Sequence, residues 1–161
     1  MSIKVGDLIP EEKLTIMTKE SGPKGLSLRD HGKNKKIILI GIPGAFTPTC
    51  HMNHLPGYLE HYETIKSKGI DEIICFGTND IFVMNAWMQS LNAGDKILAL
   101  SDSKAKFSKA LGTEYDDTFG TSIKTERLSI LIDDCVVKQI FIEPNSAQAI
   151  LSGALNMIDS L

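Results

Sequence analysis

The residues with the clearest chemical potential lead up to the first cysteine of the chain, Cys50. This cysteine ends the stretch PGAFTPTC at 43–50, which also holds two prolines, a glycine and two threonines. A cysteine thiolate is a strong nucleophile, and proline restricts φ to about −65°, so this approach would hold the sulfur in one place. Gly44 allows close approach of the backbone. Thr47 lies within reach of the sulfur or of an oxygen substrate bound to it.

Cys50 lies where a strand is expected to pass into a helix. IILIGI at 37–42 is short and rich in isoleucine, which predicts a buried parallel strand. After Cys50, apolar residues recur at helical spacing, and Gly69 can end that helix. The first turn of a helix stabilises an anion through its unpaired N–H groups and partial positive charge, which favours a reactive thiolate. The alternative is a turn rich in proline and glycine that ends in a buried cysteine.

Strands and helices alternate through the rest of the chain. Pro56 is expected to kink or split the helix after Cys50, because it cannot donate to the carbonyl of Met52. The other expected elements are strands at 71–78 and 96–102, helices at 81–91 and 104–112, a hairpin of 127–133 and 136–143, and a last helix from 145 or 146 to 161. This order predicts an α/β fold in one domain, 1–161, with a mixed sheet that is parallel in part and has an antiparallel edge.

Composition excludes several classes of protein. The net charge of −3 without blocks of basic residues argues against a nucleic-acid surface. No apolar run approaches the roughly 18 residues of a membrane helix. Three cysteines are too few for a disulfide-stapled secreted fold. The N-terminus resembles neither a signal nor a transit peptide. We therefore expect a cytoplasmic protein, or one from an organelle (mitochondrion or plastid) if a leader has been removed.

The pattern P-x-x-x-T-x-x-C, formed here by Pro43, Thr47 and Cys50, resembles the active-site signature of the peroxiredoxins. The longer stretches GIPGAFTPTC…HLPGY, DEIICFGTNDIFVMNAW, RLSILIDDCVV and LIPEEKL are similar to the type II, or peroxiredoxin-five-like, subfamily over nearly the whole chain. The resemblance implies a thioredoxin-like fold. It also implies a thiol-dependent peroxidase that reduces hydrogen peroxide and organic hydroperoxides.

The resemblance assigns roles to four catalytic residues. The thiolate of Cys50 would attack the O–O bond of the peroxide and become a sulfenic acid. Arg127, one of two arginines in the chain, would stabilise the thiolate and the transition state with its fork of donors. Thr47 would bind a peroxide oxygen through its hydroxyl, and Pro43 would shield the sulfur.

Substrate binding is expected to involve further residues of the same stretch. The backbone N–H groups of Cys50 and Thr49 would complete a cradle for the peroxide, beside Gly44. Phe46 and Phe119 are expected either at an apolar rim of the pocket or in core packing.

Two histidines near the cysteine, His51 and His54, raise the possibility of a metal site. With Cys50 they supply only three ligands beside a proline, with no obvious fourth, so no metal site is expected. His54 precedes LPGY, as in the subfamily, and is expected to make a structural hydrogen bond near the site.

The sulfenic acid must be reduced, and the other cysteines are poorly placed to do so. Cys75 lies mid-strand and is expected to be buried, and a bridge to Cys50 would need Cα atoms within about 7 Å. Cys135 is expected to be exposed at a hairpin turn, at the opposite end of its strand from Arg127. We therefore expect a one-cysteine cycle without a bound cofactor, in which glutathione with glutaredoxin, or thioredoxin, is the external reductant.

Two alternatives share this site. A peroxide-sensing module would oxidise Cys50 with little turnover. A disulfide oxidoreductase is disfavoured because the chain has no C-x-x-C at Cys50. The resemblance also implies a homodimer.

Overall fold

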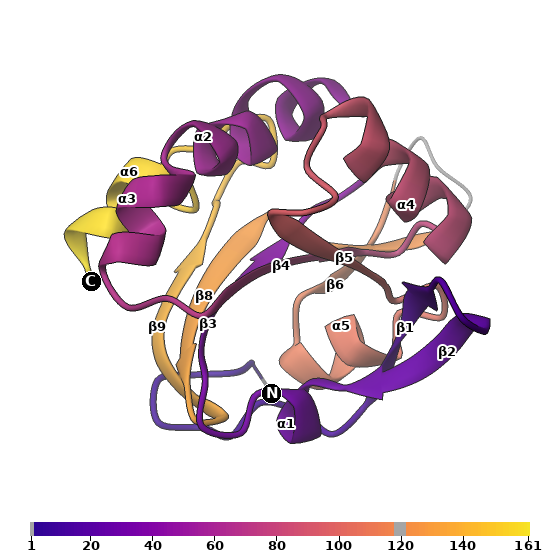
Figure 1. The fold of residues 1–161 in the computed structure, drawn as a ribbon, viewed down its shortest axis with the longest axis horizontal. Helices are drawn as coiled ribbons and strands as arrows, with labels where there is room; N and C mark the ends of the chain where they lie inside the picture. Colours follow the sequence, from indigo (N-terminus) through magenta and orange to yellow (C-terminus); the bar gives the residue numbers. More distant parts are fainter. Residues whose placement is uncertain (1, 118–121) are drawn as a thin grey trace.

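A seven-stranded mixed sheet forms the centre of the molecule (Figure 1). The computed structural model describes residues 2–117 and 122–161. The strands of the sheet are β1 (Lys13–Thr18), β2 (Gly22–Ser27), β3 (Lys36–Gly41), β4 (Glu72–Gly77), β5 (Ile97–Ser101), β8 (Leu128–Asp133) and β9 (Val136–Ile142). Their order is β2-β1-β5-β4-β3-β8-β9. The three central strands, β3 to β5, are parallel, and the outer strands are antiparallel. The predicted α/β fold with a mixed sheet is confirmed.

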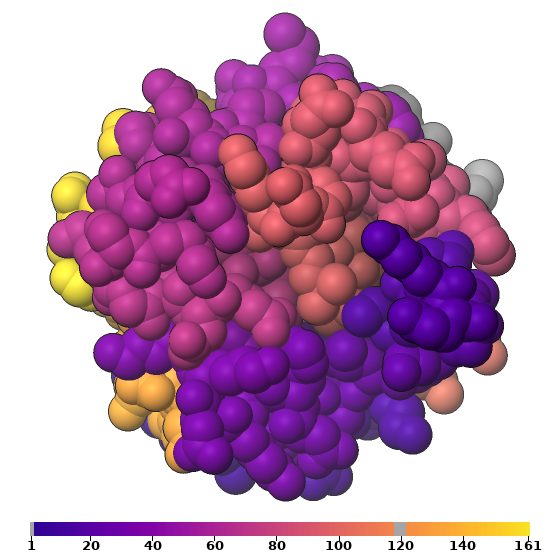
Figure 2. Space-filling model, viewed as in Figure 1, coloured from indigo at the N-terminus to yellow at the C-terminus, as the bar shows by residue number. Residues whose placement is uncertain are grey.

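Helices cover both faces of this sheet. They are α1 (Leu28–His31), α2 (Leu55–Glu60), α3 (Tyr62–Ser67), α4 (Ile81–Ser90), α5 (Lys106–Leu111) and α6 (Ala154–Asp159). In Figure 1, α2, α3, α4 and α6 lie on one side of the sheet, and α1 and α5 lie on the other. The space-filling view from the same direction shows the indigo hairpin of β1 and β2 at the right edge and the yellow C-terminal residues at the left (Figure 2). None of the helices within the described residues is long and apolar enough to cross a bilayer.

Two hydrophobic cores, one on each face, result from the alternation of side chains along the buried strands. Successive residues of a strand point to opposite faces. Ile38 and Ile40 of β3 therefore pack in the core under α2, α3, α4 and α6, whereas Ile37 and Leu39 pack in the core under α5. Both faces are covered, which explains why IILIGI reads as a continuous apolar run.

The helix after Cys50 is divided, as the proline predicted. Helical residues begin at Pro48, and a π-helical turn, η1 (Cys50–His54), precedes α2. The N–H of Leu55 bonds to the carbonyl of Cys50, one residue further back than in an α-helix. Pro56 then occupies the first turn of α2, where its missing N–H costs little.

Three features of the fold differ from expectation. The hairpin of β1 and β2 was not expected, because the exposed edge strand β2 contains proline and two glycines and lacks an apolar alternation. A short ribbon of β6 (Glu114–Asp116) and β7 (Ile123–Thr125) was also missed. The last helix begins at Ala154 rather than at 145 or 146, because the preceding residues form turns held by hydrogen bonds to Glu143.

Candidate active site

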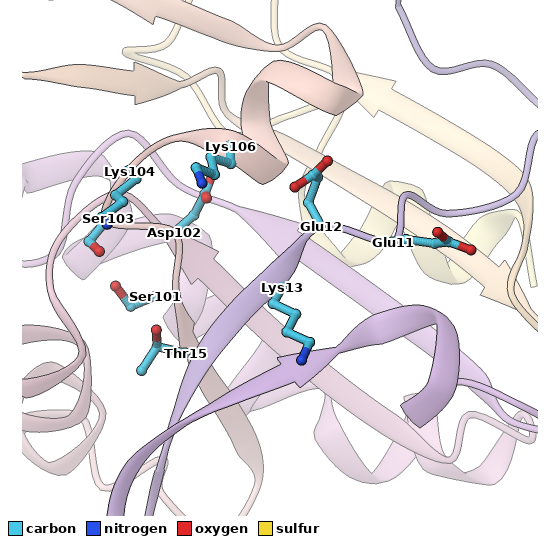
Figure 3. Close-up of a pocket in the computed structure, with 9 residues that line it drawn as sticks. All are labelled: Glu11, Glu12, Lys13, Thr15, Ser101, Asp102, Ser103, Lys104 and Lys106. Atoms are coloured by element: carbon cyan, nitrogen blue, oxygen red, sulfur yellow. The ribbon is translucent and has the colours of Figure 1, made fainter.

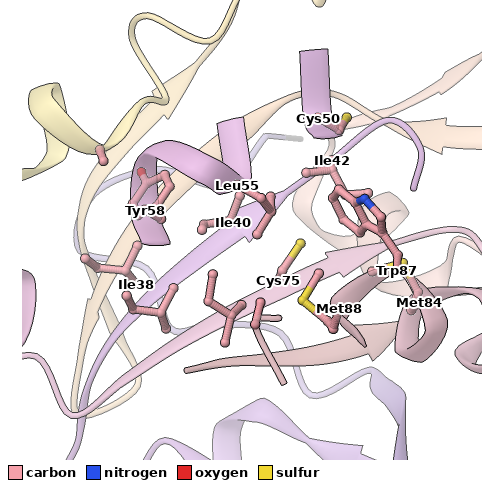
Figure 4. Packing of buried hydrophobic residues seen from close by; sticks show 14 of the residues in the cluster. Ile38, Ile40, Ile42, Cys50, Leu55, Tyr58, Cys75, Met84, Trp87 and Met88 are labelled. Atoms are coloured by element: carbon pink, nitrogen blue, oxygen red, sulfur yellow. The ribbon is translucent and has the colours of Figure 1, made fainter. Parts of the chain in front are cut away.

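Cys50 lies at the carboxyl end of β3, in the first helical turn after the loop. Its side chain is 0% exposed and belongs to the core on the α2 and α4 face. Figure 4 shows it at the edge of this cluster, with Ile42 and Trp87 labelled nearby. The strand–loop–helix position expected from the sequence is therefore confirmed. This edge is where open α/β sheets place their chemistry.

The loop before Cys50 is held by bonds within itself and to a neighbouring loop. The Thr47 hydroxyl donates to the carbonyl of Gly44 at 2.6 Å. The N–H of Ala45 donates to Oδ1 of Asn79 at 2.8 Å. Because the Thr47 hydroxyl donates its hydrogen to the carbonyl of Gly44, the hydroxyl oxygen can only accept a further hydrogen bond, for example from the O–H of a peroxide. A Cβ on Gly44 would come within 3.0 Å of the Thr47 methyl, so the glycine allows this arrangement.

Arg127 is brought to the same edge by strand pairing. It immediately precedes β8, and Leu128 pairs with Gly41 at the end of β3. The side chain is only 2% exposed. Its Nε donates to the carbonyl of Ser146 at 2.9 Å, and its Nη1 donates to Nδ1 of His54 at 3.1 Å. Burial has the largest influence on the pKa of Cys75; the charge of Cys50 raises this pKa further and that of Arg127 lowers it, so both groups lie within electrostatic range of Cys75.

His54 is buried and makes two hydrogen bonds that define its protonation. Its Nε2 lies 3.1 Å from the carbonyl of Ser152, which can only accept. Its Nδ1 faces the guanidinium of Arg127, which can only donate. Only the neutral tautomer with the proton on Nε2 satisfies both. Burial, together with the positive charge of Arg127, lowers the pKa of His54 from 6.5 to about 3. The expected hydrogen bond of His54 is confirmed, but its partner Arg127 was not foreseen.

The second histidine, His51, has a different setting. Its Nδ1 accepts from Nε1 of Trp87 at 3.0 Å, and its ring stacks with that of Phe46 at 6.0 Å. Phe46 is 51% exposed, so it does not belong to the hydrophobic core. Phe119 lies outside the described residues. Among the residues that the structure describes, no group of three His, Cys, Asp or Glu side chains could hold a metal ion.

Comparison with known proteins identifies the family. The family model described as Redoxin matches residues 4–158. Peroxiredoxin-2D of Arabidopsis thaliana is 36% identical over 99% of this chain and 98% of its own length. Chloroplastic Peroxiredoxin-2E of the same plant is 39% identical over 91% of this chain and 64% of its own length.

The chain belongs to the peroxiredoxins, type II. It is therefore a thiol-dependent peroxidase, and the resemblance stated from the sequence is confirmed.

Solved peroxiredoxins share the fold. Reduced Prx3 from Vibrio vulnificus, in complex with hydrogen peroxide, is 36% identical, with a TM-score of 0.93 over 98% of both chains. Peroxiredoxin 5 from Alvinella pompejana is 33% identical, with a TM-score of 0.86 over 98% of this chain and 97% of its own. The thioredoxin-like peroxiredoxin fold is confirmed.

The other two cysteines of this peroxiredoxin are both buried. Cys75 is fully buried, as expected, and burial, with the charge of Cys50 in addition, raises its pKa well above the usual value. Cys135 was expected to be exposed, and this is wrong. Asp134 and Cys135 both have positive φ in the β8–β9 turn, and the Cys135 thiol donates to the carbonyl of Arg29 at 2.9 Å. Burial, followed by the charge of Asp134, raises the pKa of Cys135 as well.

One small hollow of the peroxiredoxin adjoins Arg127. It measures about 170 Å³ and is lined by Tyr115, Glu126, Arg127, Glu143, Pro144 and Ser146. A larger polar groove of about 470 Å³ lies elsewhere, between β1 and the start of α5 (Figure 3). None of the residues predicted for the site lines that groove, so size alone does not mark the active site.

Thr49 makes a side-chain hydrogen bond that the sequence did not indicate. Its backbone N–H was expected to form part of the peroxide cradle, whereas its hydroxyl donates to the carbonyl of Ala147 at 3.0 Å. The segment 144–153 therefore contacts the cysteine helix through Thr49 and the arginine through Ser146. Sequence reasoning missed this segment, because its contributions are backbone carbonyls that any residue could supply.

Proposed function

We propose that Cys50 is the peroxidatic residue of a one-cysteine cycle acting on hydrogen peroxide and organic hydroperoxides. The thiolate attacks one peroxide oxygen and the O–O bond breaks. Cys50 becomes a sulfenic acid, and the departing oxygen takes a proton and leaves as water or an alcohol. The observation that carries this proposal is that the buried side chain of Arg127 lies at the same edge of the sheet as the first helical turn that contains Cys50.

The proposed roles follow from the donors and acceptors at this edge. Arg127 stabilises the thiolate and the charge that develops on the leaving oxygen. Thr47 accepts from the peroxide O–H and so orients the substrate. Pro43 and Gly44 shape the loop, and the backbone at Thr49 completes the cradle.

The proposed reductant is an external thiol, and no resident cofactor is required. Glutathione would attack the sulfenic sulfur of Cys50, release water and form a mixed disulfide, which glutaredoxin or thioredoxin would then reduce. The raised pKa of Cys75 and that of Cys135 support an external thiol, because a raised pKa disfavours the thiolate form that would attack the sulfenic sulfur.

We propose a homodimer for the assembly. Phe46, in the loop before Cys50, and Phe82, in the first turn of α4, are 51% and 63% exposed. Exposed aromatic residues of this size are characteristic of protein interfaces. We further propose one domain over 1–161, in the cytoplasm or in an organelle such as a mitochondrion or plastid, where thiols are kept reduced.

Oxidation and turnover can be followed in one experiment. Trp87, the only tryptophan of the chain, is buried in the same cluster as Cys50, so its fluorescence should report the oxidation of Cys50. We expect rapid oxidation of the wild type by hydrogen peroxide in stopped flow, and none in Cys50→Ser. The variant Cys75→Ala with Cys135→Ser should retain steady-state turnover with glutathione and glutaredoxin.

The outcomes separate the proposals. Oxidation of Cys50 no faster than that of a small-molecule thiol would contradict its peroxidatic role. Rapid oxidation without turnover by any thiol would instead favour a sensor. Loss of turnover in the folded double variant would contradict the one-cysteine cycle.

A further inference from the structure

Glu143 is a buried carboxylate to which the proposed chemistry of Cys50 gives no role. Its side chain is 5% exposed. Oε1 accepts from the N–H of Leu151 at 3.2 Å, and Oε2 accepts from the N–H and the hydroxyl of Ser152 at 2.8 and 2.6 Å. A carboxylate is retained in such a place only when it is well hydrogen-bonded. These three bonds fix the position and orientation of Ser152.

The carbonyl of Ser152 is the acceptor for two rings of the cysteine helix. Nε2 of His54 lies 3.1 Å from it, and the hydroxyl of Tyr58 donates to it at 2.6 Å. Burial, and to a smaller extent the charge of Glu143, raise the pKa of Tyr58, so the phenol remains a donor. The carbonyl of Ser152 therefore favours the tautomer of His54 that carries the proton on Nε2.

The protonation of His54 in turn decides what Arg127 meets. With the proton on Nε2, Nδ1 is an acceptor at 3.1 Å from Nη1 of Arg127. With the proton on Nδ1, two donors would face each other, and the guanidinium would have to move. The acceptor that Nη1 of Arg127 meets is therefore present in the tautomer that the carbonyl of Ser152 favours.

Glu143 also contacts Arg127 directly through the backbone. The N–H of Glu143 donates to the carbonyl of Arg127 at 2.9 Å. Glu143, Ser152, His54 and Arg127 thus form a closed ring of hydrogen bonds. Nε of Arg127 donates to Ser146 within the segment that links Glu143 to Ser152.

We propose that Glu143 is a positioning residue of the peroxidase site, which anchors Ser152, keeps the proton of His54 on Nε2 and thereby aims the guanidinium of Arg127. This inference rests on the proposed role of Arg127. A second way for Glu143 to act would be through its charge alone, because it lines the same hollow as Arg127.

The chain offers a matched control for that charge effect. Glu126 lines the same hollow beside Arg127, whereas Ser152 bonds to the carboxylate of Glu143. Glu143→Gln and Glu126→Gln therefore remove the same charge near Arg127, but only the first disturbs Ser152. In Gln at 143 one of the two carboxylate oxygens is replaced by an NH2 group, which only donates, so the N–H of either Leu151 or Ser152 would face a donor.

The test combines a spectroscopic and a kinetic measurement on the full chain. Long-range ¹H–¹⁵N spectra of ¹⁵N-histidine protein report the tautomer, and His54→Gln assigns the His54 signals among the four histidines. We expect the Nε2–H pattern in the wild type and in Glu126→Gln, and a mixture of tautomers in Glu143→Gln. Oxidation of Cys50 by hydrogen peroxide should slow about tenfold in Glu143→Gln, because the donor is misplaced, and should not change in Glu126→Gln.

Two results would overturn the proposal: an unchanged tautomer and rate in Glu143→Gln, or equal slowing in Glu126→Gln. If Glu143→Gln does not fold, Ser152→Ala serves instead, because it removes only the hydroxyl bond to Glu143. The proposal then requires a smaller change of tautomer and rate in the same direction. An unchanged tautomer and rate in Ser152→Ala would overturn it. Slow oxidation in the wild type would count against the role of Cys50 instead, while the tautomer comparison would still decide the role of Glu143.

Discussion

Nη1 of Arg127 and Nδ1 of His54, 73 residues apart in the chain, lie 3.1 Å apart in the buried site. The imidazole stays neutral beside the guanidinium, because burial and the arginine charge lower the pKa of His54 to about 3. The arginine therefore keeps an acceptor that does not become a second cation as the pH falls toward that value. Four predictions follow from the site and its surroundings.

Replacement of Arg127 by lysine should slow the oxidation of Cys50 by about 10²-fold, because lysine cannot bond to Ser146 and His54 while also presenting a donor to the peroxide. Stopped-flow fluorescence on the folded variant measures the rate. Arg29→Lys is the control, since the other arginine bonds to Ile9 and Glu11 away from the site. Equal rates in the two variants would remove Arg127 from the mechanism.

Burial of neutral His54 should make the fold acid-sensitive. The pKa of His54 is lowered from 6.5 to about 3 in the folded protein. Between these pH values His54 is therefore protonated in the unfolded chain and neutral in the folded chain. Stability is therefore lost as the pH falls through this window, by about 2 kcal/mol at about pH 5.

Urea denaturation at about pH 7.5 and about pH 5 tests this contribution. We expect His54→Gln to lose about 2 kcal/mol less than the wild type between the two conditions. His61→Gln serves as the control, at a histidine between α2 and α3. If His54→Gln lost as much free energy of unfolding between the two pH values as the wild type, burial of neutral His54 would not be the cause of the acid sensitivity.

Native thiols should react slowly with a bulky reagent such as Ellman's reagent. Cys50 and Cys75 are 0% exposed and Cys135 is 5% exposed. We expect little reaction in the folded protein and three thiols per chain in denaturant, or two in Cys50→Ser. Fast stoichiometric labelling of Cys50 in the native protein would show that its sulfur is more accessible than the structure indicates.

Gly41→Ala should destabilise the fold by about 1–3 kcal/mol. A Cβ there would come within 2.8 Å of Cγ of Leu128 and 3.1 Å of a ring carbon of Phe76, at the strand pair that places Arg127. At Gly94 the same methyl group would meet nothing within 4 Å. Chemical denaturation of the two variants should therefore separate them clearly, and equal midpoints would contradict the close packing at Gly41.

Local patterns in the sequence predicted most of the scaffold. The isoleucine-rich runs identified β3 and β4, and the proline correctly indicated that the helix after Cys50 would be divided. Expectations failed where a short-range pattern was weak. The edge strand β2 has no apolar alternation, and the turns at 144–153 depend on the distant carboxylate of Glu143.

The sequence by itself predicted the nucleophile and its approach, because Pro43, Thr47 and Cys50 lie within one loop and one helical turn. Arg127 could be proposed only from resemblance, since its nearness to Cys50 arises from the pairing of β8 with β3. Only the tertiary structure decided the burial of Cys135 and the ring of Glu143, Ser152, His54 and Arg127. The physical reason is that these contacts join main-chain carbonyls to side chains as far as 106 residues away, and a carbonyl carries no signature in the sequence.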